Sequence, residues 1–310
     1  MGKKSFKTID EQIEILEKRG LVINDKEKAK GILLRENYFF INGYRHLFTR
    51  SWKDNMFIPG TTFEELYAMF VCDRKLRNIF FKNLLIVENN IKSLISYQLS
   101  KKYGFHEKEY LDPKNFTKDS MKYRQVRDVL NKVKRQIRVN GKQHSATMHY
   151  ITNYGYIPLW ILVKVLSFGI VSELFSIMDD SDKIDVSDNY NLSPDVLEDY
   201  LSILANYRNL CAHEDILYDH RTQKSILDTK YHYLLDIENI DGEYVYGKND
   251  LFAVVIILKY LLTEYEFREL VNEIGYEIDI LEGKTSVLPI GSFLNKIGFP
   301  ENFREIVDID

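Results

Sequence analysis

Three polar side chains in the C-terminal half of the chain have the chemistry to cleave RNA. Arg208, Asn209 and His213 belong to the segment RNLCAHEDILYDHR, residues 208–221. A histidine, with a reference pKa of about 6.5, can accept the 2′-hydroxyl proton of RNA or protonate the departing 5′-oxygen. An arginine can hold the phosphorane with two N–H groups, while an asparagine amide can orient the imidazole or a phosphate oxygen. This chemistry requires no metal ion, and no cofactor is expected.

The helix expected to carry these residues does not bring all three together within one chain. On an ideal helix Asn209 and His213 lie about 40° apart and share a face, whereas Arg208 lies about 140° from His213. A frayed helix end or a second subunit must therefore complete the group. The alternative is an ordinary helix end with a surface arginine and a histidine favoured by the helix dipole, because this spacing is common.

Two glycine-containing segments match phosphate-binding loops only in part. Residues 242–249, GEYVYGKN, have the glycine and lysine spacing of a P-loop, but Asn249 stands where serine or threonine must coordinate magnesium. Residues 283–285, GKT, supply that ending, but Ile278 stands where the first glycine is required. Because short glycine patterns recur by chance, neither segment is expected to bind a phosphate.

Helical periodicity dominates the chain and predicts an all-α fold. Thr8, Thr61 and Thr62 are each followed three residues later by glutamate, the pattern of a capping box at a helix start. The pattern predicts helices over about residues 8–20, 25–35, 62–103, 120–139, 158–178 and 193–213, with two or three more toward the C-terminus.

The helix that carries the RNA-cleaving candidates is expected to begin at Ser193, because Ser193 suits an N-cap and Pro194 the first helical position. The helix over 62–103 would be on the order of 60 Å long, so it is expected to be kinked or to form a structural spine. Residues 179–191 are predicted to be a polar linker, and the Asp-Gly pair at 241–242 a tight hairpin.

Charge is unevenly distributed along the chain. Residues 1–178 contain 31 Lys and Arg against 18 Asp and Glu, whereas residues 179–310 contain 11 against 28. Residues 101–145 hold 13 basic and 5 acidic residues with aromatic residues between them, a composition typical of an RNA-binding surface. A solvated helical face gives the same pattern. The residues expected to bind RNA are Lys122, Arg124, Arg127, Lys132, Lys134, Arg135, Arg138 and Lys142.

The motif and its surroundings resemble a known family. The segment from Arg208 to His213 is similar to the RNxxxH signature of HEPN ribonuclease domains. The chain as a whole resembles the Abi family of bacterial abortive-infection proteins, of the AbiD and AbiF type. The resemblance covers most of the chain, through the blocks KTIDEQIEILEKRGLVI, NYFFINGYRHLF, CDRKLRNIFFKNLLIVENNIKSLISYQLSKKYG, HYITNYGYIPLWILVKVLSFGIVSELFSIM and IGFPENF.

The resemblance implies a HEPN-type helical bundle that works as a homodimer. HEPN domains place two motifs face to face across a pseudo-twofold interface, and this chain has one motif, so arginine of one protomer would meet histidine of the other. The implied division of the chain begins with an N-terminal helical extension at residues 1–60. A HEPN core follows at 61–222, with a basic helical insertion at about 104–155. A mixed or helical C-terminal region occupies residues 223–310.

The resemblance also implies three supporting residues beside the cleft, Glu88, Asn89 and His149. Glu88 and Asn89 fall in a polar patch of the long predicted helix, where a solvated face is the alternative interpretation. For His149 the alternative is a histidine packed into the core.

The function implied by the resemblance is a metal-independent endoribonuclease toxin of an abortive-infection system. RNA would be its substrate, and a small structured noncoding RNA on the basic segment its regulator. The alternative is a non-catalytic RNA-binding or sensor protein with the same fold. Because the first residues lack an apolar signal-peptide core and no run reaches about 18 apolar residues, the chain is expected in the cytoplasm without membrane contact.

Overall fold

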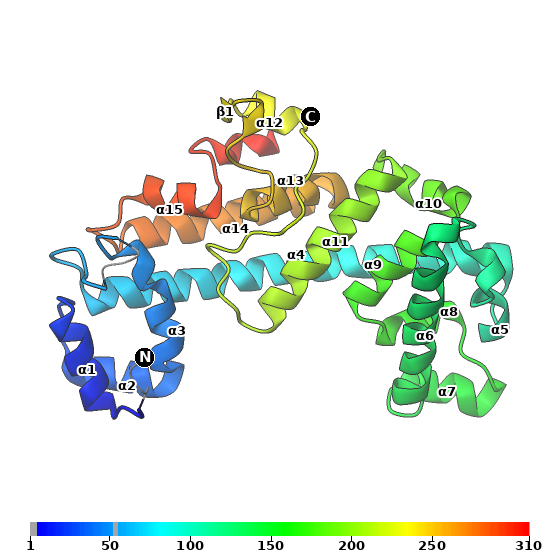
Figure 1. Cartoon of the computed structure of the whole chain (residues 1–310), viewed down its shortest axis with the longest axis horizontal. Coiled ribbons are helices and arrows are strands. Elements are labelled where there is room, and N and C mark those ends of the chain that lie inside the picture. The colour runs from blue at the N-terminus through cyan, green and yellow to red at the C-terminus, as the bar shows by residue number, and fades with distance from the viewer. Residues whose placement is uncertain (1–4, 52–54, 310) are drawn as a thin grey trace.

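The computed structural model describes residues 5–51 and 55–309. The fold is all-α, as predicted: the structure is 68% helical, and the sheet of the described residues is one two-stranded ribbon. A single helix of 41 residues, α4 (Phe63–Tyr103), runs through the molecule and carries the other elements on its sides (Figure 1). It is the structural spine that the sequence allowed, and it is continuous.

The first elements pack against each other at the N-terminal end of α4. They are α1 (Ile9–Lys18), α2 (Lys26–Glu36), α3 (Tyr38–Asn42) and the 3₁₀ turn η1 (Gly43–Leu47). Thr8 caps α1 through the predicted capping box with Glu11. These elements lie below α4 on the left of Figure 1.

The start of α4 uses one of the two predicted capping boxes. Thr62 and Glu65 form the box, in which each side chain bonds the backbone N–H of the other residue. The prediction of an overlapping capping box at Thr61 is wrong, because Thr61 is buried and its hydroxyl donates to the carbonyl of Ile58. The helix ends at Gly104, whose φ of 99° lies in the region that favours glycine.

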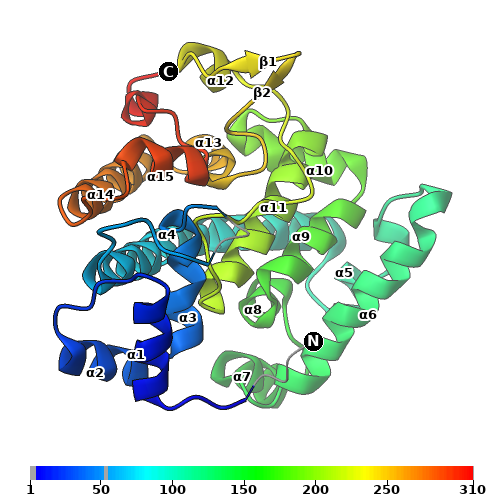
Figure 2. The ribbon, with the colours of Figure 1, turned by 60° about the vertical axis from the view of Figure 1, so that its left-hand side comes forward.

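At the other end of α4, a second group of helices lies on the same side as α1–α3 (Figures 1 and 2). The elements are α5 (Glu107–Tyr110), η2 (Pro113–Asn115), η3 (Ser120–Lys122), α6 (Tyr123–Asn140), α7 (Ser145–Tyr154), α8 (Leu159–Leu162), η4 (Val163–Val165) and α9 (Phe168–Ile177). α6 buries Val126, Val129 and Val133 and packs on α9. Its opposite face is left to solvent.

The single apolar helix predicted over residues 158–178 is wrong. The chain leaves the helix after η4, where Leu166 adopts an extended backbone conformation. Ser167 then caps α9 by accepting from the N–H of Ile170. Helical periodicity alone does not reveal this break, because both pieces are rich in apolar residues and both contribute side chains to the core.

The polar linker predicted over residues 179–191 is also wrong, because most of it is helical. α10 (Asp180–Ser187) and η5 (Asp188–Tyr190) occupy it. The buried carboxylate of Asp182 accepts hydrogen bonds from Lys102 at 2.6 Å and Tyr103 at 2.7 Å. Such pairs satisfy polar groups that the sequence pattern assigned to solvent.

The motif-bearing helix is α11 (Pro194–Ala212), which Ser193 caps as predicted. It packs between α4 and α9. The chain continues through α12 (Lys230–Leu234), β1 (Asn239–Ile240), β2 (Glu243–Tyr244), α13 (Leu251–Leu261), α14 (Glu264–Glu282), α15 (Ile290–Ile297) and η6 (Phe303–Val307).

The predicted hairpin at residues 241–242 is present between β1 and β2. Asp241 and Gly242 both have positive φ, 53° and 90°, as the tight turn requires. α14 packs along α4, on the side opposite α1–α3 (Figures 1 and 2). Among the described residues, no helix combines the length and the apolar composition needed to cross a bilayer.

Candidate functional site

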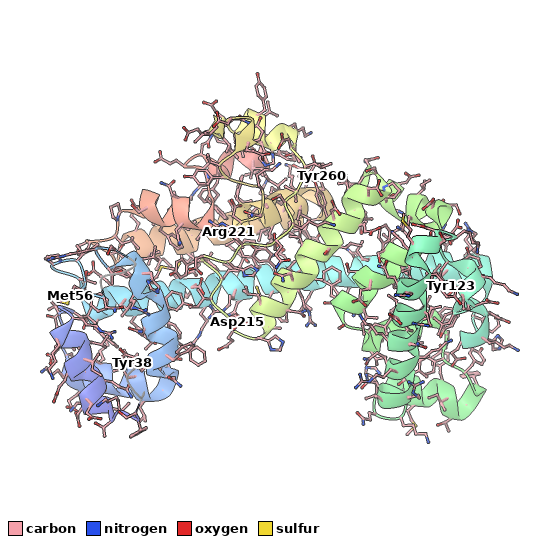
Figure 3. The ribbon with its side chains drawn as sticks, viewed as in Figure 1. Tyr38, Met56, Tyr123, Asp215, Arg221 and Tyr260 are labelled. Carbon is pink, nitrogen blue, oxygen red and sulfur yellow. The ribbon has the colours of Figure 1, made fainter. Side chains whose placement is uncertain are left out.

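The site begins where α11 ends. Ala212 is the last helical residue, and His213 follows it at the C-cap. The turn is closed without glycine: Glu214 takes a left-handed φ of 57°, and the N–H of Asp215 donates to the carbonyl of Leu210 at 3.2 Å. Figure 3 labels Asp215 below α4, at the tip of this turn.

Asn209 and His213 both line an open cavity at this helix end. Both residues are exposed, and the cavity has a volume of about 360 Å³. The remaining lining residues are Asn206, Leu210, Asp215, Ile216 and His220. A shared face for Asn209 and His213 is what one helical turn between them implies.

The side chain of Arg208 contacts α4 instead of the cavity of Asn209 and His213. Its Nε donates to Oε2 of Glu88 on α4 at 3.1 Å, and its guanidinium lies 5.7 Å from the centre of the Phe81 ring. Glu88 also pairs with Lys92, at 2.6 Å, and is buried. Arg208 is not among the residues that line the cavity of Asn209 and His213. Within the described protomer the three motif residues therefore do not converge.

The other supporting residues inferred from the sequence lie apart from the motif. Asn89 is exposed, although its neighbour Glu88 is buried, so only Glu88 of this pair contacts the motif. His149 is exposed on α7 rather than packed in the core, and its Nδ1 lies 3.0 Å from the amide of Asn153. The structure records no contact between His149 and the motif among the described residues.

A buried ionic network behind the motif was not anticipated from the sequence. Asp73 of α4 is fully buried and ion-paired with Arg77, and it accepts a hydrogen bond from Tyr44 at 2.6 Å. It also accepts from the backbone N–H groups of Leu217 and Tyr218, at 3.2 and 2.9 Å. Burial raises the pKa of Asp73, and the arginine and these donors oppose that rise.

This network fixes the backbone that follows the motif. Arg77 additionally donates to the carbonyl of Asp215 at 3.3 Å, so both ends of the 215–218 segment are tied to α4. The only sequence signal is an aspartate and an arginine four residues apart on a face that is otherwise apolar. Such a pair in a helix is usually read as a surface salt bridge.

The predicted RNA-binding residues fall into two groups. Lys122 and Lys132 are already paired with carboxylates, Lys122 with Glu198 at 3.8 Å and Lys132 with Glu173 at 2.6 Å. Arg127 lies 3.5 Å from its neighbour Asp128 on the surface. The others are exposed and have no acidic partner within the described residues: Arg124, Lys134, Arg135, Arg138 and Lys142.

Four unpaired cations of α6 share one face with Arg127. Arg124, Arg127, Lys134, Arg135 and Arg138 lie within an arc of about 100° on an ideal helix, opposite the buried valines of α6. We call this set the α6 basic stripe. The spacing explains why the positive charge is concentrated rather than spread around the helix.

Both glycine segments make bonds within the chain. The backbone N–H of Gly247 donates to the carboxylate of Asp250 at 3.0 Å, and Lys248 is paired with Asp228. Thr285 donates its hydroxyl to the carbonyl of Leu281. Several groups that a phosphate would need are thus engaged within the chain. No group of three His, Cys, Asp or Glu suited to a metal ion occurs among the described residues.

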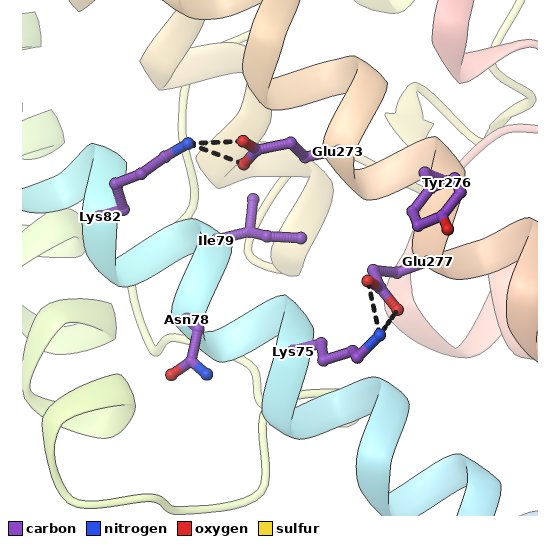
Figure 4. A pocket seen from close by; sticks show the side chains of 7 residues that line it. All are labelled: Lys75, Asn78, Ile79, Lys82, Glu273, Tyr276 and Glu277. Carbon is purple, nitrogen blue, oxygen red and sulfur yellow. Dashed lines mark hydrogen bonds and ion pairs between the residues drawn. The ribbon is translucent and has the colours of Figure 1, made fainter.

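A second cavity, between α4 and α14, has no unpaired charge to offer a ligand. Lys75 bonds both carboxylate oxygens of Glu277 at 2.9 Å, and Lys82 bonds those of Glu273 at 2.7 and 2.8 Å (Figure 4). Ile79 lies between the two ion pairs. The arrangement fastens α14 to α4, and we assign this cavity a structural role.

Comparison with known proteins identifies the family. The sequence model of a family described as Abi-like protein matches residues 31–219, which is more than half of the chain. No curated protein and no solved structure gives a significant match. The matched region contains α4, α11 and the motif from Arg208 to His213. The chain therefore belongs to the Abi-like protein family.

Proposed function

We propose that the protein is a metal-independent endoribonuclease of the HEPN type that acts as a toxin in abortive infection. Family membership supports the association with abortive infection. The observation that carries the catalytic part is the placement of Asn209 and His213, both exposed, on one open cavity at the end of α11. An exposed imidazole beside a neutral amide is suited to proton transfer at a ribose 2′-hydroxyl or a leaving oxygen.

The active unit in this proposal is a homodimer. Arg208 is held by Glu88 and lies outside the cavity lined by His213 of the same chain. A second copy would supply its arginine to that cavity, where the guanidinium would hold a phosphate through paired N–H groups. Glu88 then acts as a positioning residue that fixes the direction of Arg208.

The α6 basic stripe is the proposed binding surface for RNA, including a structured noncoding regulatory RNA. Its exposed cations have the spacing to contact consecutive phosphates, and Tyr123, which is 70% exposed at the start of α6, offers a ring for base stacking. The alternative function, RNA binding without cleavage, rests on this same stripe.

The test is cleavage of total bacterial RNA in the presence of EDTA by the purified chain and by His213→Ala. Cleavage that leaves 2′,3′-cyclic phosphate ends and falls by at least about 100-fold in the variant supports the proposal. RNA bound with equal affinity by both proteins, with no cleavage by either, would overturn the catalytic part and favour the binding alternative.

The composite dimer has its own test. Arg208→Ala and His213→Ala proteins are each expected to be inactive alone. When mixed and allowed to exchange subunits, half of the dimers combine the two variants, and each such dimer regains one of its two sites. The mixture should thus recover up to about a quarter of the wild-type activity. No recovery, with exchange confirmed by mass spectrometry, would place both residues in the same protomer's site.

A further inference from the structure

A second histidine lines the cavity of the motif. His220 lies seven residues after His213, just beyond the region that the family model matches. It contributes to the cavity shared with Asn209 and His213 and also to an adjoining cavity of about 530 Å³. The lining of the adjoining cavity is polar, with Ser202, Asn206, Arg221, Thr222, Gln223 and Lys224.

The ring of His220 is held in one orientation. Its Nε2 lies 2.7 Å from Oδ1 of Asn206, and the ring packs edge-on against Tyr207 with the centres 5.0 Å apart. The hydroxyl of Tyr207 donates to the backbone carbonyl of His220 at 3.3 Å, which anchors the residue from behind. Asn206 and Tyr207 both belong to α11, so the same helix positions His213 and His220.

This hydrogen bond selects the tautomer. An amide oxygen only accepts, so Nε2 of His220 carries the proton, and Nδ1 carries the lone pair in the neutral ring. No hydrogen bond occupies that Nδ1 within the part of the chain that the structure describes. The ring is thus oriented with one free basic atom.

The surroundings of His220 favour its neutral form. Burial is the largest influence and lowers the pKa of His220 below its usual 6.5. Arg221 lowers it further, while Asp219 and Asp215 act in the opposite direction. His213 and Asp215 are the other titratable groups that line the same cavity.

We propose that His220 is a second catalytic imidazole of this site and acts as the general base, with His213 as the general acid. This inference rests on the proposed ribonuclease function. Two histidines on one cavity can hold the two protonation states that cleavage by transesterification needs at the same moment.

The proposed step balances as follows. Nδ1 of His220 takes the proton of the ribose 2′-hydroxyl while the 2′-oxygen forms its bond to phosphorus. The bond from phosphorus to the 5′-oxygen breaks, and that oxygen takes a proton from the His213 ring. The products are a 2′,3′-cyclic phosphate and a 5′-hydroxyl, and exchange with water restores both histidines.

The experiment compares the full chain with His220→Gln across pH 5 to 8. Glutamine places an amide N–H near the position of Nε2, so it keeps the bond to Asn206 but cannot titrate. The expected result is a rate about 100-fold lower at pH 7, with loss of the rise in rate that accompanies deprotonation on the acid side. The matched control is His106→Gln, which alters the N-cap histidine of α5, outside the site.

Two results would overturn the inference. One is a His220→Gln enzyme that keeps the wild-type pH profile while His213→Ala is inactive, which would leave the ribonuclease proposal standing. The second result would come from a separate experiment, NMR of ring-labelled histidines with a 2′-deoxy dinucleotide, which binds without being cleaved. Phosphate in the cavity should change the chemical shifts of both His213 and His220. An unchanged chemical shift of His220 would overturn the proposal, even if the wild-type chain cleaves no RNA.

Discussion

At the scale of single residues, the motif depends on partners that are remote in the sequence. Arg208 is directed by Glu88, and the segment after His213 is held by Asp73. The motif residues themselves could be selected from the sequence because their types and spacing suit one chemistry. Their partners could not be, since a glutamate and an aspartate on a long helix give no sign of which distant group they meet.

Removing the carboxylate charge of Asp73 should destabilise the fold. Asp73→Asn leaves the guanidinium of Arg77, which is 3% exposed, buried without its counterion. The expected loss in the free energy of unfolding is about 3–5 kcal/mol, because breaking a buried pair from one side leaves an uncompensated charge. Equilibrium urea unfolding followed by circular dichroism measures it.

The control for that variant is Asp185→Asn, which changes an exposed aspartate on α10. It should cost less than about 0.5 kcal/mol. Equal effects of the two substitutions would show that the Asp73 network contributes nothing specific. Under the proposed ribonuclease function, a destabilised but folded Asp73→Asn protein should also cleave RNA more slowly, because the backbone after His213 loses its anchor.

Asp250 gives the fold a pH dependence with a definite sign. The residue caps α13 and accepts from the N–H groups of Gly247 and Ala253, yet burial raises its pKa to about 6. The folded state therefore holds the proton more tightly than the unfolded state. Its contribution to stability is fully present below about pH 4 and is lost as the pH rises through 6.

Asp250→Asn tests this assignment, because asparagine also caps helices but does not titrate. Between pH 4 and 7 the wild-type free energy of unfolding should fall relative to that of the variant by about 2–3 kcal/mol. Urea unfolding of both proteins at the two pH values gives the difference. A difference that stays constant between pH 4 and 7 would contradict a raised pKa for Asp250.

At the scale of elements, the sequence located helices well where caps and periodicity agree, as for α1, α4 and α11. It failed where tertiary contacts decide. α10 is polar in composition but is held by ion pairs such as that of Lys183 with Glu198, at 2.7 Å. The break between α8 and α9 is set by packing and a serine cap, which a uniformly apolar run conceals.

The N-terminus of α4 depends on a carboxylate that serves two elements. Glu65 accepts from the N–H of Thr62 at 2.9 Å and from those of Ser286 and Val287, at 2.5 and 3.1 Å, ahead of α15. Glu65→Ala should lower the free energy of unfolding by about 2–4 kcal/mol, since it removes a cap and leaves three part-buried N–H groups without this partner.

The matched control is Glu64→Ala, one residue earlier in the same helical turn. Glu64 is partly exposed and takes no part in the capping box, so its loss should cost less than about 0.5 kcal/mol. Thermal unfolding of both variants provides the comparison. If Glu64→Ala is as destabilised as Glu65→Ala, the general charge of the first turn matters more than the bonds to the 286–287 segment.

At the scale of the whole molecule, charge and shape act together. The groups α1–α3 and α5–α8 extend from the two ends of α4 on one side, and the motif turn after α11 lies between them in the view of Figure 3. The all-α class followed from the sequence. The arrangement around α4 did not, because it joins residues such as Asp73 and Tyr218 that are 145 positions apart.

If the α6 basic stripe is the RNA surface, as proposed above, it should dominate the salt dependence of RNA binding. Each phosphate contact adds about 0.7 to the slope of log affinity against log salt for a single strand. Replacing Lys134, Arg135 and Arg138 by glutamine should therefore reduce the slope by about 2, as measured by fluorescence anisotropy with a labelled RNA between 50 and 300 mM salt.

The control must lose the same net charge elsewhere. Glutamine at Lys18, Lys26 and Lys28 removes three exposed cations from α1 and α2, far along the chain from α6. If RNA is attracted only by overall charge, both triple variants will weaken binding alike, because long-range attraction depends little on position. If the stripe is the contact surface, only the α6 variant will show a smaller slope of log affinity against log salt. The reason is that counterions are released only where phosphates touch the protein.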